Sequence, residues 1–148
     1  MDALQNILTH AHSGLRYLIL ILLIVSIYTS LTKKGNDSFS ASDLKTYMFT
    51  MIFTHVQFLI GMALFFITGR YKISGEVMKD SIARFYAVEH TAMMILAVIL
   101  ITIGYSKSKK ADTVAGKHKS IALFYSIALV IILAAIPWPF RGLGASWF

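Results

Sequence analysis

Histidine is the residue type in this sequence best suited to chemistry. The 148 residues contain five histidines and no cysteine. Histidine is the commonest metal ligand and proton carrier near neutral pH, and ionisable groups inside membrane spans usually face a bundle interior, a pore or a cofactor. The lack of cysteine excludes disulfides, iron–sulfur clusters and covalently attached c-type haem, so any tetrapyrrole must be held non-covalently. The five are His10, His12, His55, His90 and His118.

Four apolar runs carry these histidines in or beside them. Residues are 57% hydrophobic and only 14% charged, whereas a soluble domain has about 25% charged residues. The runs are close to the roughly 20 residues that a spanning helix needs, and backbone in lipid must satisfy its own hydrogen bonds. We therefore predict an all-α membrane protein, a single domain over 1–148 forming an up-down-up-down bundle of four transmembrane helices. The predicted spans are 15–32, 46–68, 86–105 and 121–140.

The basic residues predict how the bundle is oriented. The loops "KKGNDSFSASDLK" and "SKSKKADTVAGKHKS" contain eight lysines, against six basic residues at the opposite ends of the helices. By the positive-inside rule the lysine loops face the cytoplasm, which places both termini in the periplasm of a bacterial inner membrane. The net charge of +7 is thus assigned to topology, with the lipid bilayer as partner and no nucleic acid. The N-terminus lacks the basic region of a signal peptide, so the first helix is expected to be retained.

Depth along the helices suggests which histidines could pair. At about 1.5 Å per residue, His90 lies roughly 6 Å inside the outer edge of its span and His12 roughly 4 Å outside its own. An outer His12–His90 pair is therefore feasible. His55 lies roughly 14 Å from the cytoplasmic edge and His118 roughly 4 Å beyond it, which disfavours an inner pair unless the fourth helix begins near Asp112. His118, among lysines in "KHKS", also fits a solvated loop residue.

The "HAH" spacing separates the two N-terminal histidines. Residues two apart on a helix point about 200° apart, so His10 and His12 cannot both face one interior. Arg16 shares the His12 face, where a cation would suit an acidic cofactor edge such as haem propionates. Arg84 or Arg141 could supply a second cation.

Glu89 stands directly before His90 in "RFYAVEHTAMM". We expect an ion pair with Arg84 or a contact with Arg16 to neutralise it; alternatively it relays protons to a quinone. At the C-terminus, Pro137 and Pro139 are expected to end the fourth helix. Trp138 and Trp147 then look like interfacial anchors.

Four segments, "AHSGLRY", "FTHVQFLIG", "FYAVEHTAMM" and "KHKSIALFY…IPWPF", together resemble a family of small four-helix bacterial membrane proteins labelled as b-type cytochromes and seen especially in Bacteroidota. The resemblance implies electron transfer through bis-histidine haem b, one or two groups, with His12, His55, His90 and His118 as the family histidines and His10 as an extra. The larger bacterial cytochrome b561 proteins, also four-helix and quinone-reactive, offer an analogy. Quinol or a periplasmic redox protein would then be the partner.

Two other classes of function remain open on the sequence. One is a non-redox subunit or assembly factor of a larger complex, or a homo-oligomer, in which the histidines are structural. The other is an outer-face non-haem metal site built from His10, His12, Glu89 and His90, a donor set suited to zinc, copper or iron. That second site needs the HAH turn to be extended.

The charge distribution makes the orientation testable. A tag fused after Phe148 should be reached by a membrane-impermeant reagent from the periplasm, because the lysine loops are retained in the cytoplasm. A tag that reacts only after the cells are permeabilised would reverse the orientation and leave the helix count unchanged.

Overall fold

The computed structural model describes residues 2–35, 38–145 and 147, with the Asp2 side chain left out. This part of the chain is helical and contains no strand. Asn36 and Asp37, in the first predicted lysine loop, lie outside the described residues. The four long helices are α1 (Asp2–Lys33), α2 (Ala41–Ile67), α5 (His90–Lys110) and α6 (Val114–Ala135). Between α2 and α5 lie the short α3 (Gly75–Lys79), α4 (Ser81–Arg84) and the π-helical η1 (Phe85–Glu89), and the 3-10 turn η2 (Pro139–Arg141) follows α6.

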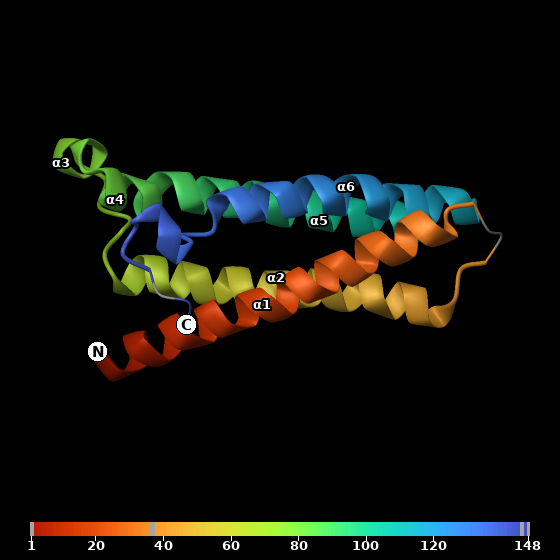
Figure 1. The fold of residues 1–148 in the computed structure, drawn as a ribbon, viewed down its shortest axis with the longest axis horizontal. Helices are drawn as coiled ribbons and strands as arrows, with labels where there is room; N and C mark the ends of the chain where they lie inside the picture. Colours follow the sequence, from red (N-terminus) through yellow and green to blue (C-terminus); the bar gives the residue numbers. More distant parts are fainter. Residues whose placement is uncertain (1, 36–37, 146, 148) are drawn as a thin grey trace.

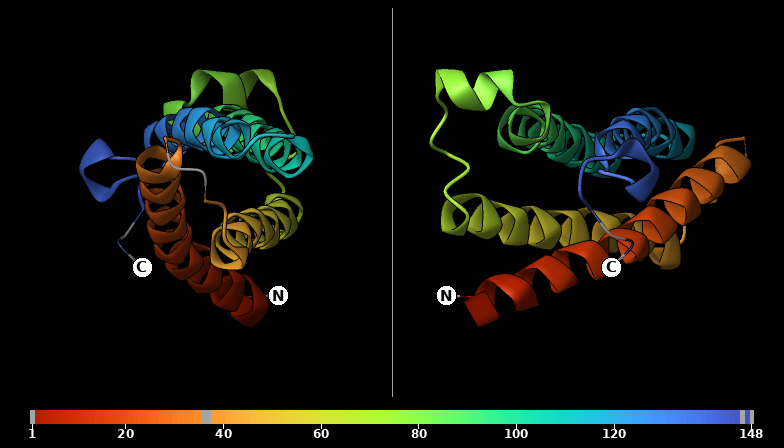
Figure 2. Two further views of the ribbon diagram at one scale, coloured as in Figure 1. Left: turned by 90° about the vertical axis from the view of Figure 1, so that its right-hand side faces the viewer. Right: turned by 60° about the vertical axis from the view of Figure 1, so that its left-hand side comes forward.

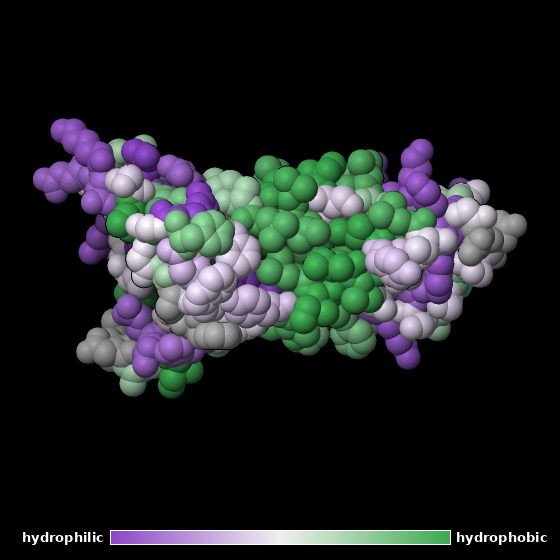
Figure 3. Space-filling model, in the orientation of Figure 1, coloured by the Kyte–Doolittle hydropathy of each residue, from purple (hydrophilic) through white to green (hydrophobic). Residues whose placement is uncertain are grey.

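Four helical segments are long and apolar enough to cross a membrane: Ala3–Lys33, Ala41–Ile67, Ser81–Lys110 and Val114–Ala135. The third consists of α4, η1 and α5 in succession. On the face drawn in Figure 3 apolar residues form a band across the middle of the molecule, with polar residues towards both ends. The predicted all-helical membrane class is confirmed.

All four of these helical segments begin before the apolar runs that predicted them, while α6 ends at Ala135, five residues before the predicted end at 140, because two prolines follow. Hydropathy marks the part that suits hydrocarbon, whereas a helix continues until a side chain or a proline ends it. The first helix accordingly begins thirteen residues before the predicted Leu15, at Asp2, so that both N-terminal histidines are helical. The fourth begins at Val114, where the Thr113 hydroxyl accepts a hydrogen bond from the Gly116 amide.

Each long helix packs against two others, so that α1, α2, α5 and α6 surround one interior (Figure 2). Within the pairs α1–α2 and α5–α6, the residue numbers of successive contacts rise along one helix and fall along the other, which shows that the two helices are antiparallel. The residue pairs that show this for α1 and α2 are His12 with Gln57, Ser26 with Thr50 and Lys33 with Asp43. Those for α5 and α6 are His90 with Ala135 and Gly104 with Phe124.

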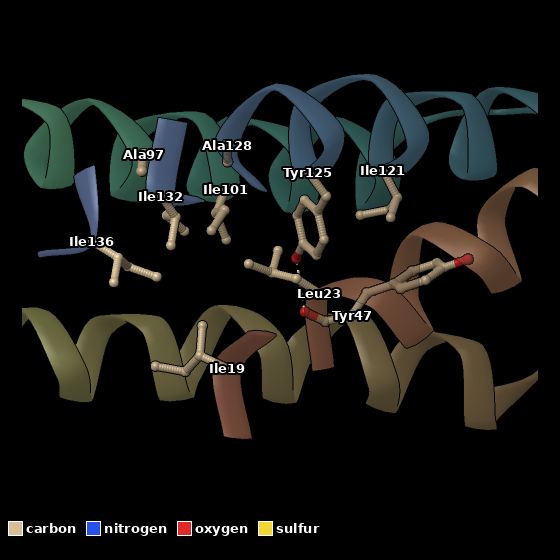
Figure 4. Packing of buried hydrophobic residues seen from close by; sticks show 10 residues of the cluster. All are labelled: Ile19, Leu23, Tyr47, Ala97, Ile101, Ile121, Tyr125, Ala128, Ile132 and Ile136. Atoms are coloured by element: carbon tan, nitrogen blue, oxygen red, sulfur yellow. Dashed lines mark hydrogen bonds between the residues drawn. The ribbon is translucent and has the colours of Figure 1, made fainter. Parts of the chain in front are cut away.

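The interior is filled by aliphatic and tyrosine side chains from all four helices (Figure 4). Leu23, Ile101 and Ile121 are fully buried. Polar groups here are paired between helices: the Tyr125 hydroxyl donates to the Tyr47 carbonyl at 2.8 Å. This core holds the four helices together along the middle of the bundle.

The two ends of the bundle differ. We call the end containing His12 and His90 the histidine end, and the opposite end, which contains residues 33–35, 38–45 and 106–120, the lysine end. In Figure 1 the distance between α1 and α6 increases towards the N-terminus of α1, so these two helices diverge at the histidine end. Polar side chains of α1 and α5 approach each other there.

The α5–α6 contact depends on Gly104. A Cβ atom at this position would lie 2.7 Å from Phe124 Cβ, closer than carbon atoms can pack. Gly104→Ala should therefore lower the free energy of unfolding by about 1–3 kcal/mol, measured as a lower thermal midpoint in detergent. Gly14→Ala is the matched control, since a Cβ there meets nothing within 4 Å; equal midpoints for both variants would contradict close packing of α5 on α6.

Candidate functional site: the histidine end

His12 on α1 and His90 at the start of α5 face each other across the bundle. Their ring centroids are 6.3 Å apart and the ring planes are 72° apart. The two helices are not sequence neighbours, and each packs on α2 and α6. The expected approach of these two histidines is confirmed, while their role as ligands stays a prediction.

His90 is held by the end of α6. Its Nδ1–H donates to the Ala135 carbonyl at 2.8 Å. In a continuous helix that carbonyl would accept from the amide four residues on, but residue 139 is proline and has no N–H. With Nδ1 carrying the proton, the neutral imidazole keeps its lone pair on Nε2.

The other last carbonyls of α6 are also bound by side chains. Pro137 cannot donate to the Leu133 carbonyl, which instead accepts from the Trp138 indole at 3.0 Å. Arg141 donates to the carbonyls of Ala134 and Ile136 at 2.8 and 3.0 Å. The "IPWPF" motif therefore ends the helix as predicted and also releases a carbonyl for His90.

A π-helical turn immediately precedes His90. In η1 the backbone bonds span five residues, and the His90 amide donates to the Phe85 carbonyl. The Thr91 hydroxyl donates to the Tyr86 carbonyl, again five residues back, at 3.1 Å. A π turn inserts one residue and so rotates the next part of the helix about its axis, and such turns are frequent at functional sites. The rotation decides which side of α5 His90 lies on.

His12 lies against α2 at a glycine. A Cβ at Gly61 would be 3.0 Å from His12 Cε1, so only glycine gives the imidazole this space without displacing it. Gln57, one turn earlier, donates through Nε2–H to the His12 backbone carbonyl at 2.7 Å. The Nδ1 atom of His12 is buried without a hydrogen-bond partner.

Arginines provide positive charge around the two histidines. Arg16 and Arg70 are both within electrostatic reach of His12 and His90. The Arg16 guanidinium donates to the Trp147 carbonyl at 2.8 Å, and its Nε is buried without a partner. Arg70 lies over the Tyr86 ring, 4.1 Å from the centroid. Sequence reasoning missed Arg70 as a site residue, although its place directly after α2 was a signal.

The C-terminal segment crosses the histidine end. The Tyr86 hydroxyl donates to the Leu143 carbonyl at 3.1 Å, and the Tyr17 hydroxyl donates to the Trp147 carbonyl at 2.8 Å. Trp138 and Trp147 contact each other, with ring centroids 6.2 Å apart. The tail is therefore attached to α1 and to the π turn, beside His12 and His90.

Arg84 is engaged elsewhere. Its Nε–H donates to Glu89 at 2.9 Å and its Nη1–H donates to the Met78 carbonyl at 3.1 Å. The expected Arg84–Glu89 ion pair is thus present. Arg84 remains a predicted contact for a cofactor, but Arg70 is the second cation that the structure gives to the histidines.

The four-residue non-haem metal site is not assembled. His10 and Glu89 are exposed, and His10 lies on the outer side of α1. No group of three or more His, Asp or Glu side chains able to hold a metal ion occurs among the described residues.

His55 and His118 bind different partners and do not meet. His55 Nδ1–H donates to the Met51 carbonyl at 2.8 Å, and Nε2 lies 3.3 Å from the Thr102 hydroxyl of α5. His118 contacts Tyr47, which is eight residues, about 12 Å, away from His55 along α2. The structure therefore offers no pair at the lysine end, and an inner haem stays a prediction.

The solvated placement of His118 was wrong. Its side chain is fully buried because α6 starts early and carries it beneath the α1–α2 connection. The Tyr47 hydroxyl donates to His118 Nδ1 at 2.8 Å, and Nε2–H donates to the Ser38 carbonyl at 3.2 Å. Both ring nitrogens are used in fixing the fold.

The ring separation at the histidine end restricts what could lie between the two imidazoles. A metal–imidazole bond is about 2 Å long and the ring centroid about 1 Å beyond the nitrogen, so two imidazoles on opposite sides of one metal have centroids about 6 Å apart. At a tetrahedral angle the separation would be about 5 Å. The observed 6.3 Å is compatible with both imidazoles binding one metal ion placed between them.

Two imidazoles that simply pack against each other have similar separations. Hydrogen bonding must therefore distinguish a packed pair from a pair that binds a metal. Two histidines packed only for stability would be expected to have both ring nitrogens paired, as His118 does. At the histidine end Nδ1 of His12 is unpaired, and the bond to Ala135 leaves the lone pair of His90 on Nε2. These residues fit a bis-histidine group with anionic substituents.

Comparisons of the chain with protein-family models, with curated proteins and with solved structures find no match.

The Tyr47–His118 bond gives a prediction about the lysine end. Tyr47→Phe removes the donor to a buried imidazole nitrogen and should lower the free energy of unfolding by about 1–3 kcal/mol, measured by thermal unfolding in detergent. Tyr28→Phe, at a tyrosine that is 69% exposed, is the control. A structural role for His118 would be refuted if both variants unfolded at the wild-type temperature.

Proposed function

We propose that this protein is an integral membrane b-type cytochrome that holds one haem b axially between His12 and His90. The observation that carries the proposal is the pair of imidazoles across the bundle, 6.3 Å apart, with His90 oriented by the Ala135 carbonyl. Orientation of a ligand histidine by an acceptor on its other nitrogen is the usual arrangement at metal sites. The family resemblance supports the same assignment.

Haem bound at this position supplies a one-electron carrier whose potential depends on its ligands, burial and nearby charge. The chain contributes each of these. His12 and His90 would furnish two nitrogen ligands, and both are half-buried between the helices. Arg16 and Arg70 place positive charge near both histidines, which would favour binding of an anionic cofactor.

The partners are inferred from the place of the site along the helices. The histidine end is the end expected to face the periplasm, so electrons would be exchanged with quinol in the bilayer or with a periplasmic redox protein. Aromatic side chains of the C-terminal segment lie beside the site, at the level where membrane-interface aromatics usually lie. The protein would act in the bacterial inner membrane, alone, as a homo-oligomer or within a larger complex.

Haem binding and its ligands can be tested on the purified protein. We expect a Soret band, the narrow α band of six-coordinate low-spin iron and a pyridine haemochrome typical of haem b. His12→Ala and His90→Ala should each remove the haem or make it five-coordinate, because each vacates an axial position. Arg16→Gln should change the midpoint potential or weaken binding while both ligands remain.

His10→Ala is the matched control, since it removes an exposed histidine only two residues from His12. Its spectrum should equal that of the wild type. Haem-supplemented cells that yield protein without a Soret band would refute the cytochrome and favour a structural subunit. Loss of haem from His10→Ala alone would refute the choice of His12.

A further inference from the structure

Two unpartnered polar atoms belong to residues that already touch. Gln57 donates to the backbone carbonyl of His12 through its Nε2–H at 2.7 Å, while its Oε1 is buried without a partner. The Nδ1 atom of His12 is also buried without a partner. A buried polar atom without a hydrogen bond destabilises the protein, because it loses its bond to water and gains none in return. Gln57 Oε1 is an acceptor, and His12 Nδ1 is a donor when it carries the proton.

The orientation of the Gln57 amide is fixed by the contact it makes. Turning the amide over would set its oxygen against the carbonyl oxygen of His12, and two acceptors repel. The amide nitrogen therefore stays on the carbonyl, which leaves Oε1 as a free acceptor next to the His12 side chain.

The His12 ring lies against α2 beside Gln57. Measured from the Cβ position at Gly61, His12 Cε1 is 3.0 Å away, Nδ1 is 3.6 Å away and Nε2 is 3.9 Å away. Gly61 and Gln57 are four residues apart and lie on one face of α2. Of the two ring nitrogens Nδ1 is the nearer to this face, and the ring needs the glycine in order to lie there.

The two facing histidines are otherwise unequal. His90 has an acceptor for its Nδ1–H in the Ala135 carbonyl, whereas His12 has none. A histidine that binds a metal through one nitrogen almost always donates its other N–H to an acceptor. Gln57 is the side chain placed to fill this gap.

We propose that Gln57 is the positioning residue of His12: when Nε2 of His12 binds the iron, Gln57 Oε1 closes onto Nδ1–H in a hydrogen bond that neither atom makes in this structure, and so directs Nε2 towards the iron and His90. One amide would then hold both the backbone and the ring of the same ligand. The inference rests on the proposed haem site, and adds the residue that sets the tautomer and electron donation of one ligand.

Two substitutions at Gln57 separate this role from simple packing. Gln57→Glu keeps an acceptor but loses the N–H that binds the His12 carbonyl, and Gln57→Leu loses both. Haem affinity, measured by titrating haem into haem-free protein in one detergent, should fall about 10–100-fold for Gln57→Leu. It should fall less for Gln57→Glu, because one carboxylate oxygen can still accept from Nδ1–H although the other faces the His12 carbonyl.

The midpoint potential is the second measurement. It should rise in Gln57→Leu, because an imidazole whose N–H is not hydrogen-bonded is a weaker electron donor to the metal. Thr54→Val is the packing control, since Thr54 is buried on α2 and donates only within its own helix, to the Thr50 carbonyl at 2.7 Å. Affinity and potential should both be unchanged in this control.

The outcomes distinguish the two proposals. If wild-type protein binds no haem, the proposed function is refuted and this inference with it. If the wild type binds haem through His12 and His90 but the two Gln57 variants lose affinity equally, the N–H bond to the backbone is what matters and the positioning role is refuted. Wild-type affinity and potential in Gln57→Leu would refute it as well.

Discussion

Inside a bilayer there is no water to bind a polar group, so backbone and buried side chains must find hydrogen-bond partners within the protein. The bundle meets this requirement along most of its length. Ser26 binds Thr50 between α1 and α2, and Tyr125 binds the Tyr47 backbone between α6 and α2. The hydroxyls that could disrupt the apolar interior instead connect the helices that surround it.

The two ends satisfy the same requirement differently. At the lysine end most buried polar groups are paired: Lys33 pairs with Asp43, which also completes the cap of α2, and His118 uses both ring nitrogens, while the Ser108 hydroxyl is unpaired. Among the described residues four buried side-chain atoms have no partner, and those of His12, Arg16 and Gln57 lie at the histidine end. Unpaired polar atoms beside two facing imidazoles are groups that a polar cofactor and its ligands can use.

Pro137 and Pro139 determine how the last turn of α6 is hydrogen-bonded and how His90 is oriented. Two missing N–H groups in "IPWPF" leave carbonyls at the end of α6 without backbone donors. A tryptophan indole, an arginine and His90 bind these last carbonyls. The same bond that completes the helix end also sets the tautomer of His90. The end of α6 and the orientation of the His90 imidazole therefore depend on one hydrogen bond, and the π turn directly before His90 sets where that residue lies on α5.

Local sequence patterns determined the helical membrane class, the end of the fourth helix and the opposite directions of His10 and His12, because hydropathy, proline chemistry and helix periodicity act over a few residues. They also predicted the Arg84–Glu89 pair, five residues apart. Only the tertiary structure decided that His12 meets His90, that His118 is buried and that Arg70 and Gln57 join the site. Those contacts depend on the tilt and rotation of helices that are distant in sequence. The contact of His12 with Gly61 and the π turn before His90 set them, and no local sequence pattern reveals either feature.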